Sequence, residues 1–241
     1  ICKSLLKSIQ EAKYTIDFAI YGLRGQDKIL NALKDAQKRG VIIRAVIDKD
    51  AEGNNYYSDT YKIEQKIKNV KTDYNSDKST YQKLKNRKIF PDSKKCKRPT
   101  KTKGPLQCFE GIGYASKEKI IFKGNIMHNK FFIFDNKLVW SGSANISDTG
   151  TGGYNANAVF LLRNEKLVKF YTKEFNQMYI KEIYHTEKSE LGTKKISGKN
   201  NSEIELYFSP SDKTTGKILD LIDNSRLSID VTIFFLTHKK I

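Results

Sequence analysis

Helical and strand-like patterns alternate at the start of the chain. Apolar side chains recur at helical spacing over residues 3–12, and β-branched and aromatic residues alternate over 14–21. A second helical pattern over 27–39 ends at Gly40, and an apolar strand follows over 41–47. A strand, a helix and a strand at this spacing form a βαβ unit, which predicts a sheet that is at least partly parallel.

Regular patterns return in the second half of the chain. Residues 130–134 and 138–140 flank a short polar turn and predict a β-hairpin. Residues 158–162 predict another strand, and 167–180 predict a helix with an apolar stripe. The elements together predict an α/β fold with a mixed, mostly parallel sheet flanked by helices.

The pattern weakens between residues 49 and about 119, which we interpret as a basic surface insertion. Residues 82–105 hold ten Lys and Arg side chains against one acid, Asp92. Two interpretations stay open: a solvated run of charge, or an arm that lies over a phosphate-bearing substrate.

The end of the chain repeats its beginning. Residues 203–208 predict a strand, and 217–234 align with 4–21 at a constant offset of 213 residues. The repeat predicts a first half over 1–195 and the incomplete beginning of a second half over 196–241. The alternative is a repeated helix–strand packing unit without catalytic meaning.

Charge predicts a polyanionic partner. The 44 Lys and Arg residues exceed the 27 Asp and Glu residues by 17, which suits nucleic acid or the surface of an anionic phospholipid membrane. The abundance of Lys, Asn and Ile also fits an AT-rich genome, so codon bias is a competing explanation. No apolar run approaches the roughly 20 residues of a membrane helix, and no signal peptide is visible. The chain starts at Ile1 without Met, so we expect that upstream sequence is removed, which leaves a bacterial cytoplasmic or a secreted or periplasmic location open.

Cysteine usage gives a weaker signal. The odd count of three, Cys2, Cys96 and Cys108, argues against a full disulfide framework. Cys96 and Cys108 flank a basic loop and are either bridged or free thiols. Their spacing does not fit a zinc site.

The candidate chemistry lies at the start of the predicted hairpin. His128 and Lys130 are two residues apart on an extended segment, so their side chains share a face, while Phe131 and Ile133 point to the other face and into the core. An ammonium beside an imidazole suits an anionic reaction centre, and its charge lowers the imidazole pKa and favours the neutral nucleophile. The small and polar residues of 141–145 could form an oxyanion cradle.

At these residues the chain resembles the phospholipase D superfamily. The signature of that superfamily is His-x-Lys, four residues, Asp, six residues, then Gly-Ser and Asn. The matching residues are His128, Lys130, Asp135, Gly142, Ser143 and Asn145. The opening helix, the strand over 14–21 and Asp48 also look like the start of a family half, and Asn157 occupies the place of a supporting polar residue.

The resemblance implies a two-step displacement without a metal ion or cofactor. His128 would attack phosphorus to form a phosphohistidine, and Lys130, Ser143 and Asn145 would hold the phosphoryl oxygens. Asp135 is implied as the third catalytic residue, which supports the site. Whether it orients an imidazole across the half-to-half interface is left open by the sequence. Gly142 and Asn157 are implied as supporting residues.

One departure from the family pattern is serious, because the chain holds a single His-x-Lys motif. His238 lies where the repeat predicts the start of a helix, and His185 has no partner motif. The second catalytic half would come from a downstream segment or from a homodimer partner, and the isolated chain is expected to be inactive without it.

Three functions are compatible with these features. The first is an endonuclease that cleaves DNA or RNA phosphodiesters, which the charge and the basic 82–105 stretch favour. The second is a phospholipase D or a cardiolipin-synthase-type phosphatidyl transferase, although no amphipathic membrane helix with exposed aromatic residues is predicted. The third is a non-catalytic binding domain, against which the intact motif argues.

Overall fold

The computed structural model separates the chain into two compact units, 1–184 and 185–241, and each is described by itself. The unit boundary lies about ten residues before the boundary predicted between the halves. The structure describes residues 1–87, 96–97, 107–110, 113–115, 120–121, 125–191, 195–198, 202–233, 236 and 241. His238 lies outside these residues.

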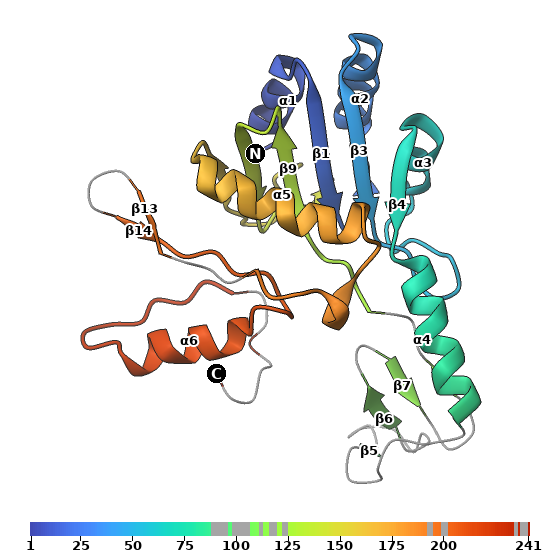
Figure 1. Cartoon of the computed structure of the whole chain (residues 1–241), viewed down its shortest axis with the longest axis vertical. Helices are drawn as coiled ribbons and strands as arrows, with labels where there is room; N and C mark the ends of the chain where they lie inside the picture. Colours follow the sequence, from blue (N-terminus) through green and yellow to red (C-terminus); the bar gives the residue numbers. More distant parts are fainter. Residues whose placement is uncertain are drawn as a thin grey trace. The chain divides into compact units, whose positions relative to one another are not determined.

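A six-stranded sheet forms the centre of the first unit (Figure 1). Its order is β12 (Val159–Leu162), β10 (Leu138–Gly142), β9 (Lys130–Phe134), β1 (Thr15–Ile20), β3 (Ile42–Ile47) and β4 (Asn69–Thr72). β1, β3 and β4 pair in parallel, and β9, β10 and β12 add antiparallel pairs. The sheet is mixed, as predicted, but it is not mostly parallel. Two of its five pairings are parallel, because the β9–β10 hairpin pairs with β1 in the antiparallel direction.

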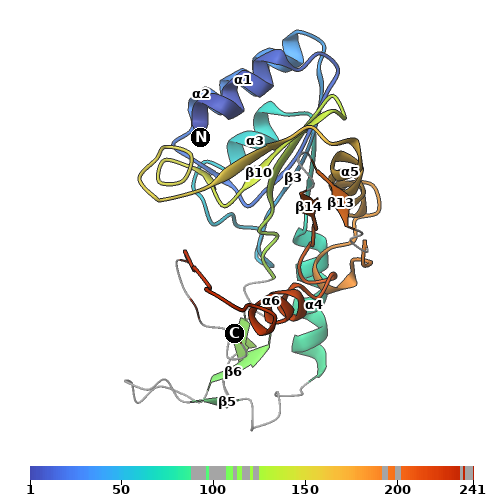
Figure 2. The ribbon, with the colours of Figure 1, turned by 90° about the vertical axis from the view of Figure 1, so that its left-hand side faces the viewer.

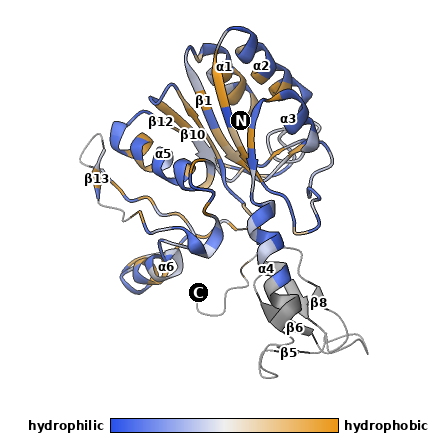
Figure 3. Ribbon diagram, turned by 45° about the vertical axis from the view of Figure 1, so that its right-hand side comes forward, coloured by the Kyte–Doolittle hydropathy of each residue, from blue (hydrophilic) through white to orange (hydrophobic). Residues whose placement is uncertain are grey.

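Helices cover both faces of the sheet, as Figure 2 shows. α1 (Cys2–Glu11), α2 (Asp27–Lys38) and α3 (Tyr61–Lys66) contribute apolar side chains to a core on one face. α5 (Glu165–Tyr179) packs on the other face, where Tyr171 meets the ring of Phe131 at 5.1 Å between centroids. Figure 3 shows the apolar residues concentrated in the central strands and in stripes along the flanking helices. Among the described residues, no helix is long and apolar enough to cross a membrane.

Burial on both faces explains the aromatic run in β9. All four residues of 131–134 are buried. Phe131 faces α5, whereas Phe132 stacks on Phe18 at 4.9 Å within the core below α1 and α2. A strand that is covered on both sides is continuously apolar rather than alternating. The prediction that Phe131 points into a core is therefore confirmed, and the structure adds a second core on the other face.

Part of the expected 49–119 insertion belongs to the central fold. α3 places Ile63 in the core, and β4 forms the outer parallel strand beside β3. Because α3 is short and β4 is an edge strand, few of their residues are buried, so the apolar pattern is weak. α4 (Tyr74–Arg87) follows. The rest of the basic stretch falls largely outside the described residues.

A small sheet follows α4 with the order β5-β6-β7-β8. Its strands are β5 (Cys96–Lys97), β6 (Gln107–Glu110), β7 (Gly113–Ala115) and β8 (Ile120–Ile121). The backbones of Cys96 and Cys108 lie opposite each other in an antiparallel pair. Both alternatives from the sequence, a bridge and two free thiols, are compatible with this register.

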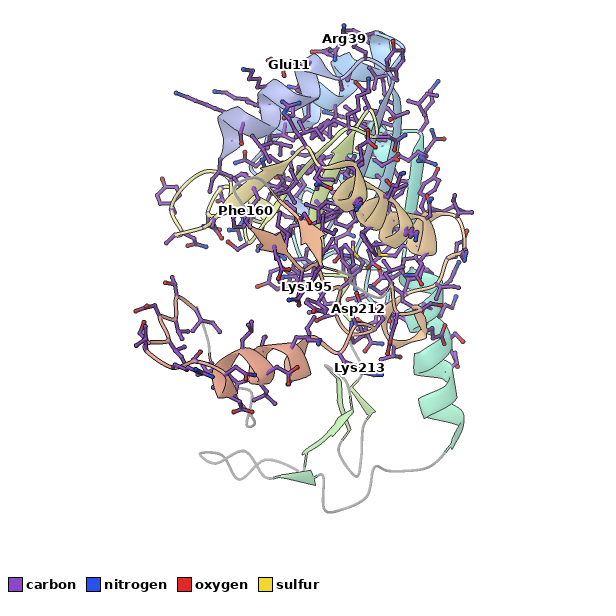
Figure 4. The ribbon with its side chains drawn as sticks, turned by 60° about the vertical axis from the view of Figure 1, so that its left-hand side comes forward. Glu11, Arg39, Phe160, Lys195, Asp212 and Lys213 are labelled. Atoms are coloured by element: carbon purple, nitrogen blue, oxygen red, sulfur yellow. The ribbon has the colours of Figure 1, made fainter. Side chains whose placement is uncertain are left out.

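The described residues of the second unit hold little regular structure. β13 (Ile196–Ser197) pairs with β14 (Glu203–Ile204), which is shorter than the strand predicted over 203–208, and α6 (Thr214–Asp223) follows. Asp212, labelled in Figure 4, accepts hydrogen bonds from the N–H groups of Leu191 at 2.9 Å and Phe208 at 2.8 Å. Residues 228–233, which repeat β1 in sequence, do not form a strand.

Candidate active site

Strand direction gathers His128, Lys130 and Ser143 at one edge of the sheet, the lower end of β1 and β3 in Figure 1. β1, β3 and β10 end at this edge, whereas the antiparallel β9 and β12 begin there. Tyr21 and Asp48 follow β1 and β3, Ser143 follows β10, and His128 and Asn157 precede β9 and β12. Ligand sites of open α/β sheets lie outside the carboxyl ends of the parallel strands.

His128 and Lys130 lie together at this edge. Lys130 pairs with Ile20 across β9 and β1, and its Nζ donates a hydrogen bond to the carbonyl oxygen of His128 at 2.8 Å. The His128 ring packs edge-on against Tyr21, with 4.7 Å between ring centroids, while part of the side chain is open to solvent. The Lys130 ammonium therefore lies against the backbone carbonyl of His128, and its charge acts on the imidazole.

The surroundings change the pKa values of both groups. Burial, and then the charge of Lys130, lower the pKa of His128 from 6.5 to about 4. Burial lowers the pKa of Lys130 from 10.5 to about 8. At neutral pH the imidazole is therefore neutral, with a free lone pair, and the ammonium beside it is mostly charged. This combination suits attack on an anionic centre.

Ser143 and Asn157 form a second polar pair at the same edge. Ser143 Oγ donates to Asn157 Oδ1 at 2.9 Å and accepts from the N–H of Ala158 at 3.1 Å. Gly142 permits this approach of the two strands, because a Cβ atom there would lie 2.1 Å from the carbonyl oxygen of Ala158. The expected supporting residues therefore hold the Ser143 hydroxyl in place.

Asn145 lies in a compact loop that follows β10. Its carbonyl oxygen accepts hydrogen bonds from the N–H groups of Ser147 at 2.9 Å and Thr151 at 3.0 Å. Gly150 packs so closely that a Cβ atom there would lie 2.2 Å from the same oxygen. The backbone is thus fixed, whereas the buried Asn145 Oδ1 has no hydrogen-bond partner within the described part of the chain. This oxygen is an acceptor, so only the Nδ2 group of Asn145 could donate to a phosphoryl oxygen.

Asp135 lies at the opposite edge of the sheet. It follows β9, five residues and about 17 Å along an extended strand from Lys130. Its carboxylate accepts from the N–H groups of Lys13 at 2.9 Å, Tyr14 at 2.7 Å and Thr15 at 2.8 Å. Burial alone would raise its pKa, but the three N–H groups hold the pKa below the ordinary value. This half does not bring Asp135 to His128, so a catalytic role across an interface stays a prediction.

Two residues at the site were not singled out for a role by the sequence. The buried Asp48 accepts from the N–H of Met127 at 2.7 Å and so anchors the segment that carries His128. Tyr21 contacts the His128 ring and its N–H bonds to Asn129 O at 3.1 Å, which extends the β1–β9 ladder. The sequence feature that could have indicated Asp48 and Tyr21 is their position, because each directly follows a parallel strand.

The chemistry of this edge suits a bound anion more than a cation. The Lys130 ammonium lies here beside a neutral imidazole and would repel a metal ion placed next to it. The Ser143 hydroxyl donates its one proton to Asn157 Oδ1 and can turn it toward a ligand. A phosphoryl group matches such a set of donors.

Comparisons with known proteins identify the family. The family described as "Cardiolipin synthase, PLD-like domain" matches residues 5–179. No curated protein matches the chain. The solved structures that resemble it include three at low identity. NucT from Helicobacter pylori has a TM-score of 0.46 and 19% identity, over 74% of this chain and 86% of that chain.

Two further solved structures resemble the chain with lower TM-scores. Nuc from Salmonella typhimurium, a phospholipase D family member, has a TM-score of 0.44 and 22% identity, over 73% of this chain and 84% of that chain. TrmBL2, an archaeal chromatin protein, has a TM-score of 0.36 and 10% identity, over 74% and 48%. Because the family match covers well over half of the chain and includes every residue of the motif from His128 to Asn157, the chain belongs to the cardiolipin synthase, PLD-like domain family.

Proposed function

We propose that the chain is a metal-independent phosphodiesterase that acts through a phosphohistidine on His128, and that it cleaves DNA or RNA as an endonuclease. The pairing of a neutral His128 imidazole with the Lys130 ammonium carries this proposal. A nucleophile that is already deprotonated at neutral pH needs neither a metal-bound hydroxide nor a separate base for the first step.

In the first step an imidazole nitrogen of His128 attacks phosphorus. A P–N bond forms as the bond from phosphorus to the leaving oxygen breaks, and a second histidine supplies the proton for that oxygen. Water, activated by the same second histidine, then breaks the P–N bond and frees His128. Lys130, Ser143 and Asn145 would hold the phosphoryl oxygens, and the Ser143 hydroxyl would turn its proton from Asn157 Oδ1 to the substrate.

The second histidine would come from the second catalytic half. Either the segment 196–241 begins such a half and a downstream part supplies the motif, or a second copy of the chain supplies its own His128. The sequence repeat favours the first of these arrangements, because 217–234 matches the helix and strand that open the first half.

Nucleic acid is the substrate that the charge favours. The excess of 17 positive charges suits a polyphosphate backbone. The family description names cardiolipin synthase, which makes a phosphatidyl transferase the second candidate. A non-catalytic binding domain is the third, and the intact constellation of His128, Lys130, Ser143 and Asn145 argues against it.

The first step can be tested without the second histidine. p-Nitrophenolate leaves phosphorus without a proton, so bis(p-nitrophenyl) phosphate in EDTA isolates the attack by His128. We expect a burst of about one p-nitrophenolate per chain and, in mass spectrometry, an acid-labile p-nitrophenyl phosphoryl adduct on His128, which keeps the second ester of the substrate. H128N should abolish the burst and the adduct, whereas H238N makes the same change outside the motif and should keep them. A burst that survives in H128N would remove the nucleophile assignment.

The substrate class needs a separate comparison. Plasmid nicking in EDTA should be compared with release of headgroup from phosphatidylglycerol vesicles, each with H128N as the blank. Nicking without lipid turnover is expected. Lipid turnover without nicking would replace the nuclease by the phosphatidyl transferase.

A further inference from the structure

Three tyrosines meet beside the candidate nucleophile. Tyr21 follows β1, and Tyr56 and Tyr57 lie in the loop that follows β3. The ring of Tyr21 stacks on that of Tyr56 with 5.3 Å between centroids and meets Tyr57 edge-on at 5.6 Å. Tyr56 and Tyr57 meet edge-on at 5.2 Å. We refer to these three residues as the tyrosine shelf.

The tyrosine shelf extends from His128 to the solvent. One side of Tyr21 contacts the His128 ring at 4.7 Å, and Tyr21 also stacks on Tyr56. Tyr21 and Tyr57 are each 8% exposed, whereas Tyr56 is 73% exposed. Tyr56 is therefore supported from within by two fixed rings, and most of its own surface is open to water.

The loop that carries the shelf is held against the fold. Thr60 Oγ1 donates to the carbonyl oxygen of Tyr57 at 2.8 Å and accepts from the N–H of Leu23 at 2.9 Å. A Cβ atom at Gly22 would lie 2.6 Å from Thr60 Oγ1, so the strand and the loop are in close contact. The guanidinium of Arg24 lies over the Tyr57 ring at 5.2 Å. These contacts give the shelf a defined shape before any ligand binds.

We infer, building on the nuclease activity proposed above, that the tyrosine shelf binds an unstacked base next to the scissile phosphate, so the preferred substrate is single-stranded nucleic acid. A base is flat, and aromatic stacking on a protein ring is tolerant of sequence. Bases inside a duplex have both faces covered by their neighbours, so they cannot stack on Tyr56 without leaving the helix.

The packing of the tyrosine shelf suits a flat base better than a quaternary ammonium group. An aromatic cage for choline needs rings spread around a cation. Here the rings lie 5.2 to 5.6 Å from one another and fill the space between them, which leaves an outer surface rather than a cage. A single exposed tyrosine is common on protein surfaces. Tyr56 differs because it stacks on Tyr21, and Tyr21 in turn contacts the imidazole of His128.

Equilibrium binding tests this inference independently of catalysis. The whole chain with H128N, which prevents cleavage, is titrated in EDTA against fluorescein-labelled oligonucleotides, single-stranded and as the matching duplex. Y56A should weaken single-strand binding by about 5- to 150-fold, the range measured for loss of one stacked base. Duplex binding should fall by much less. Y56F, which keeps the ring, should rescue single-strand binding.

Y14A is the matched control. Tyr14 is 67% exposed but precedes β1, at the opposite edge of the sheet, so its loss should leave both affinities unchanged. A 2-aminopurine base placed along the strand should be quenched by the chain and not by its Y56A form. Equal losses on both substrates, or no loss with Y56A, would overturn the inference. Displacement of the strand by phosphocholine, with no quenching of 2-aminopurine, would overturn it in favour of a headgroup site. The binding titrations do not measure cleavage. A failed burst assay would therefore reject the proposed function and leave the binding result unaffected.

Discussion

Lys130 Nζ donates to the carbonyl oxygen of His128, the residue whose imidazole it should assist. The bond holds the ammonium within the motif but leaves two of its three protons for other acceptors. Since burial lowers the pKa of Lys130 to about 8, its charge is lost at moderately alkaline pH. The charge state of Lys130, rather than that of His128, should therefore limit the reaction at high pH.

A pH profile of the burst checks this relationship. The reactive form needs neutral His128, which is present above about pH 4, and charged Lys130, which is present below about pH 8. The second-order rate of p-nitrophenolate release should therefore fall as the pH rises through 8. K130R keeps its charge at every accessible pH, so that decline should disappear, even if the rate is lower because the guanidinium is larger and planar. K137R, in the exposed turn after β9, should keep the decline. If the decline at pH 8 persists in K130R, the decline would be assigned to the titration of another group.

Asp135 gives a different prediction, because its carboxylate binds three backbone N–H groups. D135A should lower the free energy of unfolding by about 1 to 3 kcal/mol, since hydrogen bonds to a charged group are strong but two of these three are solvent-exposed. The pKa of Asp135 is lowered in the fold, so its contribution is complete above the ordinary pKa of 3.8 and is lost as the pH falls through the lower folded value. Urea denaturation at pH 7 and pH 3 measures the difference between wild type and variant.

The burst assay on the same variant separates structure from chemistry. D135A could instead lose the burst per folded chain while its free energy of unfolding stays unchanged. That outcome would place Asp135 in the reaction, through an interface that this half does not contain. A loss of stability at pH 7 that shrinks at pH 3 is the outcome expected from the hydrogen bonds.

Gly142 should tolerate no side chain. A Cβ atom there would lie 2.1 Å from Ala158 O, which is backbone and cannot rotate away. G142A should therefore separate β10 from β12, cost about 1 to 3 kcal/mol of stability and weaken the Ser143–Asn157 hydrogen bond, with loss of the burst. G216A makes the same change where no atom lies within 4 Å, so its melting temperature should be unchanged or higher. A G142A protein with normal stability and burst would show that this close approach is not needed.

Much of the fold and part of the site followed from local pattern. The period of the apolar residues predicted α1, β1, α2, β3 and the β9–β10 hairpin, because each of these elements buries a regular stripe or run. Strand direction then placed His128 and Ser143 at a common edge. α3 and β4 escaped prediction because they bury few side chains. Tyr56 was also not predicted to belong to the site. Its place beside Tyr21 depends on the conformation of a loop, which the period of apolar residues does not predict.

The repeated segment shows the limit of local pattern most clearly. Residues 228–233 repeat the sequence of β1 but are not a strand, since β1 is bonded to β3 and β9 whereas 228–233 have no strand neighbour in the described part of the chain. Ile16 is 0% exposed and its counterpart Ile229 is 53% exposed. A strand-like sequence thus needs pairing and coverage to become a strand.

Matched substitutions at Ile16 and Ile229 test whether the second half is covered in solution. I16A should cost about 2 to 5 kcal/mol, because it removes a fully buried side chain from a packed core. I229A should change the stability by less than about 0.5 kcal/mol, because the side chain already contacts water. Urea denaturation of each variant at two protein concentrations, with sedimentation to follow the mass, gives both values. A large and concentration-dependent cost of I229A would mean that a second copy of the chain covers this segment, and it would favour the dimer as the source of the second histidine.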